Sequence, residues 1–184
     1  DKQYIVPRIT DDNYLSTILE LCKKASINVI TTFIDPEMGI LAKNRDKFEE
    51  IGVEVLAPYL ETAQLCFDKF EMYKYLVKKN IKTVKTYGDF ESFNVDYENG
   101  QCKLPVFVKP RTGSGSVGAR KVDNYDELRD IYNSEEGLII QEFMSGDDLD
   151  ADVYIDTISN KAVSIFTKRK LETKIGGANK TISF

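Results

Sequence analysis

The chain has 184 residues, of which 42% are hydrophobic, so it is long and apolar enough to bury one ample core or two small ones. Its 30 acidic and 25 basic side chains give a net charge of -5, so no global positive field attracts a polyanion or a membrane surface. No run of about 18 apolar residues predicts a membrane span. We therefore expect neither nucleic acid nor a membrane as a partner.

The residue types that are scarce or missing restrict the chemistry. The three cysteines, Cys22, Cys66 and Cys102, form no C-x-x-C pair, which argues against a disulfide framework and against a zinc site. This cysteine usage fits a reducing cytoplasm. Because the chain has no histidine, the usual catalytic triads and most transition-metal sites are excluded. Any chemistry must therefore use carboxylates, lysines, arginines, backbone amides or bound cations.

Strand and helix patterns alternate through the first sixty residues. They predict strands at 4–7, 27–33 and 53–56, the second of them buried, and helices at 11–26 and 36–50. Asp12 or Asn13 can cap the first helix, and Gly52 can end the second. This rhythm is typical of a parallel sheet, so we predict part of a doubly wound domain that lacks its first strand and glycine turn.

The pattern changes near residue 80, where we place a domain boundary. One helix is predicted over 61–80, with apolar residues three to four positions apart. Beyond it, short strands are predicted at 83–86, 105–109, 119–122 and 138–142, and helices at 89–96 and 125–132. The alternating runs 148–157 and 161–170, joined by Ser159 and Asn160, predict an antiparallel hairpin.

The stretch FVKPRTGSGSVG at 107–118 has the form of a phosphate-binding loop. Its glycines match G-x-G-x-x-G, which is a weak signal alone because many glycine-rich turns are plain loops. The dinucleotide-fold version requires a helix after the last glycine, whereas a strand is predicted there. A Walker loop needs a lysine after Gly118, and a protein kinase needs H-R-D and D-F-G motifs, and the chain has none of these.

What remains is a glycine-rich loop between two strands. Its glycines and small hydroxyls leave backbone N–H groups available to anionic oxygens. Glycine suits this role because a Cβ would hold the backbone away from phosphates and restrict positive φ angles. Lys109 enters from the preceding strand, and although an isolated lysine is more often a solvated strand end, this one stands between an apolar run and Pro110.

Several stretches together carry a resemblance that covers nearly the whole chain. They are LAKNRDKFEEIGVEVL at 41–56, CFDKFEMYKYL at 66–76, FVKPRTGSGSVGARKV at 107–122, LIIQEFMSGDDLDADVYID at 138–156, and KRKLETKIGGANK near the end. In joint order and spacing they resemble the ATP-grasp superfamily, and most of all the carbamoyl-phosphate synthetase large subunit and similar carboxylate-amine ligases.

The resemblance implies an α/β fold, of the α+β type, that is a partial ATP-grasp fold. It implies an incomplete Rossmann-like pre-ATP-grasp domain with linker helices at 1–80, a small lobe with a glycine-rich lid at 81–142, and the beginning of a large lobe at 143–184. Family members end with a further stretch, roughly E-x-N-x-R, that binds magnesium, and nothing after Asn179 matches it. We therefore expect a fragment or a split protein, whose Mg²⁺ ligands lie beyond residue 184.

The resemblance also implies a set of ATP-binding residues. Lys69 corresponds to a nucleotide-contacting lysine near the phosphates, and Lys109 to the strand lysine that reaches the adenine edge and the α-phosphate. The mobile lid over the β- and γ-phosphates corresponds, together with the residue before it, to Arg111, Thr112, Gly113, Ser114, Gly115, Ser116, Val117 and Gly118.

Further positions in the second half complete the implied site. Glu142, Phe143 and Met144 correspond to the connector whose backbone binds the adenine. Asp148 corresponds to the acidic residue that contacts the ribose hydroxyls, where the family more often has glutamate. Lys168 and Arg169 resemble basic residues on a strand that runs toward the phosphates. Read without the resemblance, GDDLDAD at 146–152 is a solvated acidic turn or a calcium-like loop, although it lacks EF-hand spacing.

The implied activity is that of an ATP-dependent ligase, in which a carboxylate is phosphorylated to an acylphosphate that an amine then attacks. ATP, Mg²⁺ and small-molecule carboxylate and amine substrates are the expected ligands, and no side-chain nucleophile is needed. The alternative is a nucleotide-binding or oligomerisation module without turnover. A homodimer is a further expectation for the protein. An NAD-dependent dehydrogenase is a third hypothesis, weakened by the predicted strand after the loop. The carboxylate and the amine stay open, and a peptide or amino-acid ligase fits equally well.

Overall fold

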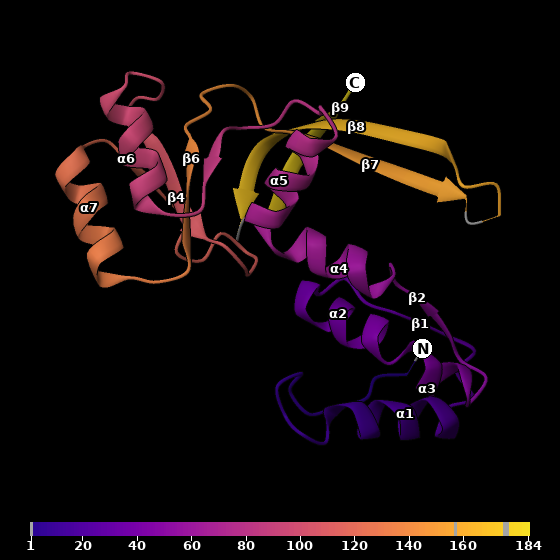
Figure 1. The fold of residues 1–184 in the computed structure, drawn as a ribbon. Helices are drawn as coiled ribbons and strands as arrows, with labels where there is room; N and C mark the ends of the chain where they lie inside the picture. Colours follow the sequence, from indigo (N-terminus) through magenta and orange to yellow (C-terminus); the bar gives the residue numbers. More distant parts are fainter. Residues whose placement is uncertain (1, 157, 175–176) are drawn as a thin grey trace. The chain divides into compact units, whose positions relative to one another are not determined.

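The computed structural model describes residues 2–156, 158–174 and 177–184 (Figure 1). The chain forms two compact units that divide between Thr83 and Val84. Among the described residues, no helix has both the length and the apolar character needed to cross a membrane. Residue 157, at the end of the first predicted hairpin strand, and residues 175 and 176, within the KRKLETKIGGANK stretch, lie outside the described residues.

The first unit contains a two-stranded parallel sheet with helices between and after its strands. In chain order its elements are α1 (Tyr14–Lys24), β1 (Val29–Thr31), α2 (Asp35–Lys43), α3 (Arg45–Glu49), β2 (Glu54–Leu56), α4 (Leu60–Phe67) and α5 (Lys69–Lys78). β1 pairs with β2 in parallel, with Ile30 opposite Val55. The predicted parallel pairing of these two segments is therefore confirmed.

Helical spacing builds the core of this unit. Tyr14, Ile18 and Cys22 recur every four residues, so they lie on one face of α1 and are buried there. They pack in one cluster with Phe48, which has no exposed surface, and with Val55 of β2. Burial of this stripe, rather than helix propensity, is what holds α1 against the sheet.

Two strand predictions in this unit are wrong in part. Residues 4–7 form no strand, because no described strand lies beside them to pair with, and Ile5 is 99% exposed. The segment 27–33 does contain β1, but it is not a buried strand. Ile30 packs against the core and Thr32 is 8% exposed, whereas Val29 stays exposed because the described sheet is two-stranded and one of its faces is covered.

Two of the three helices predicted in this unit, 36–50 and 61–80, are each broken by one polar residue. Asn44 separates α2 from α3 and folds its own side chain back, with Nδ2 donating to the Ile40 carbonyl over 2.9 Å. Asp68 separates α4 from α5, and its Oδ1 accepts from the amides of Phe70 and Glu71, both at 3.0 Å. Asn and Asp favour such caps because they compete with the helix for backbone hydrogen bonds.

The second unit begins with a four-stranded antiparallel sheet and two helices. Its elements are β3 (Thr86–Tyr87), α6 (Phe90–Glu98), β4 (Val106–Pro110), β5 (Arg120–Val122), α7 (Tyr125–Ser134) and β6 (Leu138–Glu142), and the strand order is β3-β6-β4-β5. Both helices lie on the same side of the sheet (Figure 1). Their predicted positions are confirmed, each helix being capped by the residue before it, Asp89 or Asn124.

The core of this sheet lies between its strands and the two helices. Phe93 of α6 and Leu128 of α7 have no exposed surface and pack in one cluster with Val106, Val108 and Ile140 of the central strands. The ring of Phe93 also meets Tyr87 edge to face, with 5.5 Å between the ring centroids. One face of the sheet therefore packs into this core.

A second antiparallel sheet follows, with strand order β7 (Leu149–Asp156), β8 (Lys161–Lys174) and β9 (Gly177–Ser183). The predicted hairpin is confirmed as β7 and β8, and its turn places Asn160 at φ 53°. The third strand was not predicted, because Gly177, Ala178, Asn179 and Lys180 are poor strand formers. All residues of β9 are exposed, so its pairing with β8 rather than burial produces it.

Candidate functional site

The sheet β3-β6-β4-β5 has two chemically different faces. Residues paired directly across antiparallel strands share a face, and successive residues along a strand alternate between faces. Val106, Val108 and Ile140 occupy the face that packs against the helices. The opposite face, called here the second face, carries Thr86, Phe107, Lys109, Lys121, Ile139 and Gln141.

Lys109 lies at the end of this second face, directly opposite Ile139, and is half-buried. Phe107 lies between Lys121 of β5 and Gln141 of β6. The Gln141 side chain donates from Nε2 to Thr86 Oγ1 over 2.8 Å, which fixes its position next to β3. Ile139 has no exposed surface and Thr86 is 4% exposed, so the accessible groups of the second face are the half-buried ring of Phe107, two lysines and an amide, a composition suited to a ligand with an aromatic and an anionic part.

The glycine-rich loop starts where Lys109 and Pro110 end β4. The Arg111 amide donates to the Gly137 carbonyl over 2.8 Å and anchors its start, and the Ala119 amide donates to the Ser116 carbonyl over 3.2 Å near its end. Between these bonds the backbone takes positive φ angles at four positions, namely Gly113 (101°), Gly115 (72°), Ser116 (57°) and Gly118 (72°). Such turns are the conformation in which successive N–H groups can converge on an anion.

Glycine is required at position 118 for two reasons. Its φ of 72° is unfavourable for residues with a Cβ. A Cβ there would also lie 3.2 Å from Cγ of Pro110, closer than ordinary packing allows. Most of the loop is exposed, including Thr112 and Ser114, so its conformation comes from the backbone and from its two ends. The two ends of the loop are therefore fixed by hydrogen bonds, and most of its residues are exposed to solvent.

The three predicted connector residues lie in different environments. Glu142 pairs with Val106 and is exposed, so its side chain is on the face opposite to Lys109. Its amide donates to the Lys85 carbonyl over 3.0 Å. Phe143 is half-buried, with the Lys121 ammonium 5.3 Å from its ring centroid, and Met144 is 63% exposed. Gln141, one residue before the predicted set, is the β6 residue that shares the second face with Lys109.

Lys69 belongs to the first unit and is the first residue of α5, directly after the Asp68 cap. Burial lowers the pKa of Lys69, while the charges of Asp35 and Asp68 act in the opposite direction. The side chain is half-buried. A helix N-terminus also disfavours a cation through its backbone dipole. Burial and the helix dipole therefore both disfavour the charged form of Lys69, and the nearby carboxylates of Asp35 and Asp68 favour it.

On one face of the sheet β7-β8-β9, carboxylates in and next to β7 form ion pairs with lysines of β8. Asp148 and Asp150 both bind the ammonium of Lys170, with Nζ 3.1 Å from Asp148 Oδ2 and 3.2 Å from Asp150 Oδ1. Lys168, two residues earlier on β8, binds Asp152 with 2.6 Å between Nζ and Oδ2. The predicted ribose residue Asp148 and the predicted basic residue Lys168 therefore lie on the same face of this sheet.

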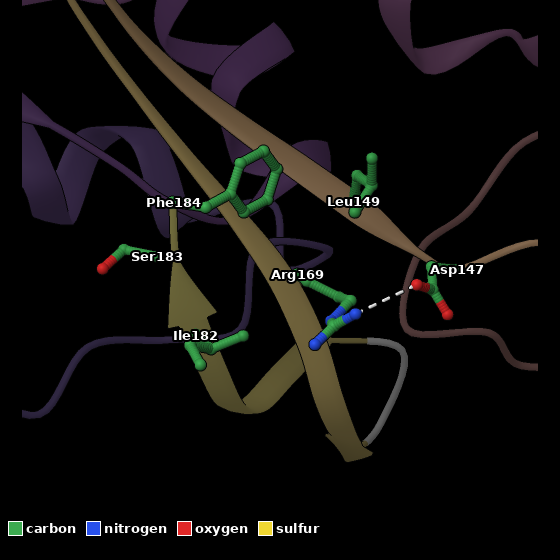
Figure 2. A pocket seen from close by; sticks show the side chains of 6 residues that line it. All are labelled: Asp147, Leu149, Arg169, Ile182, Ser183 and Phe184. Atoms are coloured by element: carbon green, nitrogen blue, oxygen red, sulfur yellow. Dashed lines mark hydrogen bonds and ion pairs between the residues drawn. The ribbon is translucent and has the colours of Figure 1, made fainter.

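Arg169 lies on the other face of the same sheet, next to a hollow of about 330 Å³ (Figure 2). Its Nη1 is 3.3 Å from Asp147 Oδ2, and the ion pair forms part of the hollow wall. The remaining lining residues are Leu149, Ile182, Ser183 and Phe184. Because successive residues of β8 alternate between faces, Lys168 and Arg169 cannot both contact one ligand on the Asp148 face.

The second unit thus brings some predicted residues together on one element and separates others. Lys109 directly precedes the glycine loop, and Asp148 shares a face with Lys168, whereas the side chains of Glu142 and Arg169 are on the opposite faces of their sheets. The residues that sequence reasoning missed are Phe107, Lys121 and Gln141 on the second face, and Lys170. The spacing D-x-D-x-D opposite K-x-K in the predicted hairpin was a signal that could have identified Lys170.

Solved structures with the same architecture have low sequence identity to this chain. Carboxyaminoimidazole ribonucleotide synthase from Aspergillus clavatus, solved with ATP, superposes with a TM-score of 0.68 at 13% identity and covers 95% of this chain and 44% of its own. The biotin carboxylase domain of the Hydrogenobacter thermophilus 2-oxoglutarate carboxylase gives 0.65 at 18% identity, over 94% of this chain and 41% of its own. These likenesses show the fold.

Sequence comparisons identify relatives among ligases and carboxylases. D-alanine–D-alanine ligase B from Clostridium perfringens is 30% identical over 98 residues, and pyruvate carboxylase from Staphylococcus aureus is 25% identical over 129 residues. The matches cover 50% and 66% of this chain, which spans only 32% and 11% of those relatives. Residues 1–56 match the family model of the PylC-like N-terminal domain, and residues 66–175 match that of the ATP-grasp domain. The chain belongs to the ATP-grasp family.

Proposed function

We propose that the second unit binds ATP for an ATP-dependent carboxylate-amine ligase, with the nucleotide on the second face of β3-β6-β4-β5 and its phosphates under the glycine loop. The observation that carries this proposal is the position of Lys109, on the second face and directly before a loop with four positive-φ residues. A lysine and converging amides at one end of a face that carries the Phe107 ring match a purine nucleotide, which is aromatic at one end and anionic at the other.

The proposed chemistry requires positioning and charge compensation rather than a side-chain nucleophile. The substrate carboxylate attacks the γ-phosphorus of ATP, which gives an acylphosphate and ADP, and the amine then attacks the acyl carbon and releases phosphate. Lys109 and the loop amides offset the negative charge on the phosphoryl oxygens, and the sequence resemblance adds Lys69 of the first unit as a second proposed nucleotide-contacting lysine. Closure of the loop excludes water that would otherwise hydrolyse the acylphosphate.

The remaining predicted residues have secondary roles in this proposal. Phe143 and Met144 border the purine, and the backbone of the connector at Glu142 binds its edge. Asp148 accepts hydrogen bonds from the ribose hydroxyls. Of the two basic residues on β8, Lys168 is the one that shares the Asp148 face, so it is proposed as the ligand-facing residue in place of Arg169.

Magnesium enters no step of the proposal. Among the described residues, no group of three or more Cys, Asp or Glu side chains is arranged to hold a metal ion. We propose that 1–80, 81–142 and 143–184 correspond to a pre-ATP-grasp domain, a small lobe and the start of a large lobe. A cytoplasmic location and a homodimer are further parts of the proposal.

Two substrate classes are compatible with the proposed ligase activity. A carbamoyl-phosphate synthetase large subunit-like enzyme is supported by the sequence stretches quoted above. An amino-acid ligase is supported by the D-alanine–D-alanine ligase relatives. The two differ in the phosphoryl acceptor, which is bicarbonate-like in the first and an amino-acid carboxylate in the second.

Hydroxylamine trapping is the experiment that tests the proposed reaction. The protein expressed from its full reading frame is incubated with ATP, Mg²⁺, hydroxylamine and either bicarbonate or a panel of amino acids. We expect acceptor-dependent ADP formation and a hydroxamate, because hydroxylamine intercepts an acylphosphate. ATP binding without ADP formation for any acceptor would instead support the non-catalytic nucleotide-binding module.

Replacement of Lys109 tests the nucleotide site itself. Lys109→Met is expected to weaken ATP binding by about 10- to 100-fold, because a hydrogen bond to a charged group contributes about 1.5–3 kcal/mol. Titration calorimetry measures the affinity, and circular dichroism checks that the fold is kept. Lys103→Met removes an exposed lysine of the same unit and is the matched control, for which we expect no change. Equal affinities for both variants would contradict the site.

The lowered pKa of Lys69 predicts a pH dependence. ATP affinity should fall as the pH rises through the pKa of Lys69, because deprotonation removes a positive charge near the phosphates. Since burial lowers that pKa, the fall should begin below the 10.5 of an ordinary lysine. In Lys69→Arg the cation is permanent, so the fall should move to higher pH.

The control for this measurement is Lys79→Arg, which replaces an exposed lysine at the other end of α5. Its pH profile should match that of the unaltered protein. A profile that is identical in the unaltered protein and in Lys69→Arg would show that Lys69 does not contact the nucleotide phosphates.

A further inference from the structure

Lys170 of β8 is held between two carboxylates of the neighbouring strand segment. Its Nζ lies 3.1 Å from Asp148 Oδ2 and 3.2 Å from Asp150 Oδ1, and its amide donates to the Asp148 carbonyl over 2.9 Å. The lysine side chain is only 13% exposed, whereas that of Asp148 is 60% exposed. Lys170 therefore fixes Asp148 through both the main chain and the side chain while leaving the carboxylate accessible.

The charges support a permanent contact. Hydrogen bonding to Asp148, followed by hydrogen bonding to Asp150, raises the pKa of Lys170, while burial acts in the opposite direction. The ammonium thus stays charged throughout the physiological range, and hydrogen bonds between charged groups are stronger than neutral ones. Asp150, with 33% of its side chain exposed, supplies the second contact that keeps Lys170 in place.

Neighbouring cations do not share this position. Lys168 pairs with Asp152, further along the strands, and Arg169 pairs with Asp147 on the other face of the sheet. Within the part of the chain that the structure describes, Lys170 is the cation recorded in an ion pair with Asp148. The predicted ribose ligand thus depends on a residue that sequence reasoning did not assign to the site.

We propose that Lys170 is a positioning residue that orients the Asp148 carboxylate toward the ribose hydroxyls, and thereby makes the site select ribonucleotides over 2′-deoxyribonucleotides. This inference rests on the proposed ATP site. A carboxylate accepts hydrogen bonds from two adjacent hydroxyls only in a restricted range of orientations. Lys170 holds Asp148 in one rotamer before the ligand arrives, so the entropy of ordering that side chain is not lost on binding.

The test compares the affinities of the full-length protein for ATP and 2′-deoxy-ATP by titration calorimetry. The unaltered protein should prefer ATP by roughly 10-fold or more, the value of one hydrogen bond to a charged group. In Lys170→Met the preference should fall below about 2-fold, because ATP loses its contact to both ribose hydroxyls and weakens more than 2′-deoxy-ATP, which has only the 3′-hydroxyl contact to lose. Equal weakening for both nucleotides would show a merely structural role and overturn the proposal.

Two further variants make the test specific. Lys170→Gln keeps a hydrogen-bond donor on a side chain one atom shorter but loses the charge, so it should fold and lose most of the preference. If it kept the full preference, the cation would not be needed and the proposal would fail. Lys180→Met is the matched control, because Lys180 pairs with Glu172 across the same sheet, with Nζ 2.8 Å from Oε2, and is 71% exposed. This control should keep the full preference.

The outcomes for the unaltered protein separate this inference from the proposed function. ATP binding with no preference over 2′-deoxy-ATP would overturn the role of Lys170 and leave the ATP site standing. Absence of binding of either nucleotide would overturn both. A preference that is present in the unaltered protein and in Lys180→Met, and lost in both Lys170 variants, is the result that the proposal predicts.

Discussion

The alternation of side chains across the β4–β6 pairing is the constraint on which the second unit depends. Val106 and Val108 must pack against α6 and α7 to build the core, so Phe107 and Lys109 must face the other way. A shift of one residue in register would bury Lys109 against Phe93 and expose the valines. The hydrophobic core therefore determines which polar groups share the second face, and the position of Lys109 is a consequence of packing.

The glycine loop, which follows β4, is the proposed site for the phosphates. An acidic protein with a net charge of -5 has no general attraction for a polyanion, so a phosphate site must be local. In the proposed site backbone amides provide it without adding charge, because their direction is determined by φ and ψ rather than by flexible side chains. Four loop residues take positive φ angles, and Lys109 at the end of β4 directly precedes the loop. Phosphate binding by backbone amides and a lysine needs no histidine, so the proposed site is compatible with a chain that has none.

The parts of the fold that were predictable are those with strong local patterns. The 14, 18 and 22 spacing of α1, the apolar run of β4 and the hairpin of β7 and β8 all appear where the sequence indicates them. The helix breaks at Asn44 and Asp68 were missed, because single caps compete with an otherwise continuous helical pattern. β9 was missed because it forms only by pairing with β8.

In the candidate site, too, the residues in a local motif were predictable and those brought in by strand pairing were not. Lys109 and the loop follow from a contiguous motif. Gln141 and Lys121 join them only through the register of β6 and β5 against β4, which no local pattern encodes. The same holds for the separation of Lys168 from Arg169, since a basic pair in sequence becomes one residue on each face of a strand.

Photoaffinity labelling with 8-azido-ATP tests the central claim most directly, because the reactive group sits on the purine and marks the protein surface beneath it. The account predicts that labelling, suppressed by excess ATP, occurs in the peptides that contain residues 107–121 and 139–144. Labelling that is suppressed by ATP but confined to 90–98 and 125–134, the helices that cover the opposite face, would contradict it.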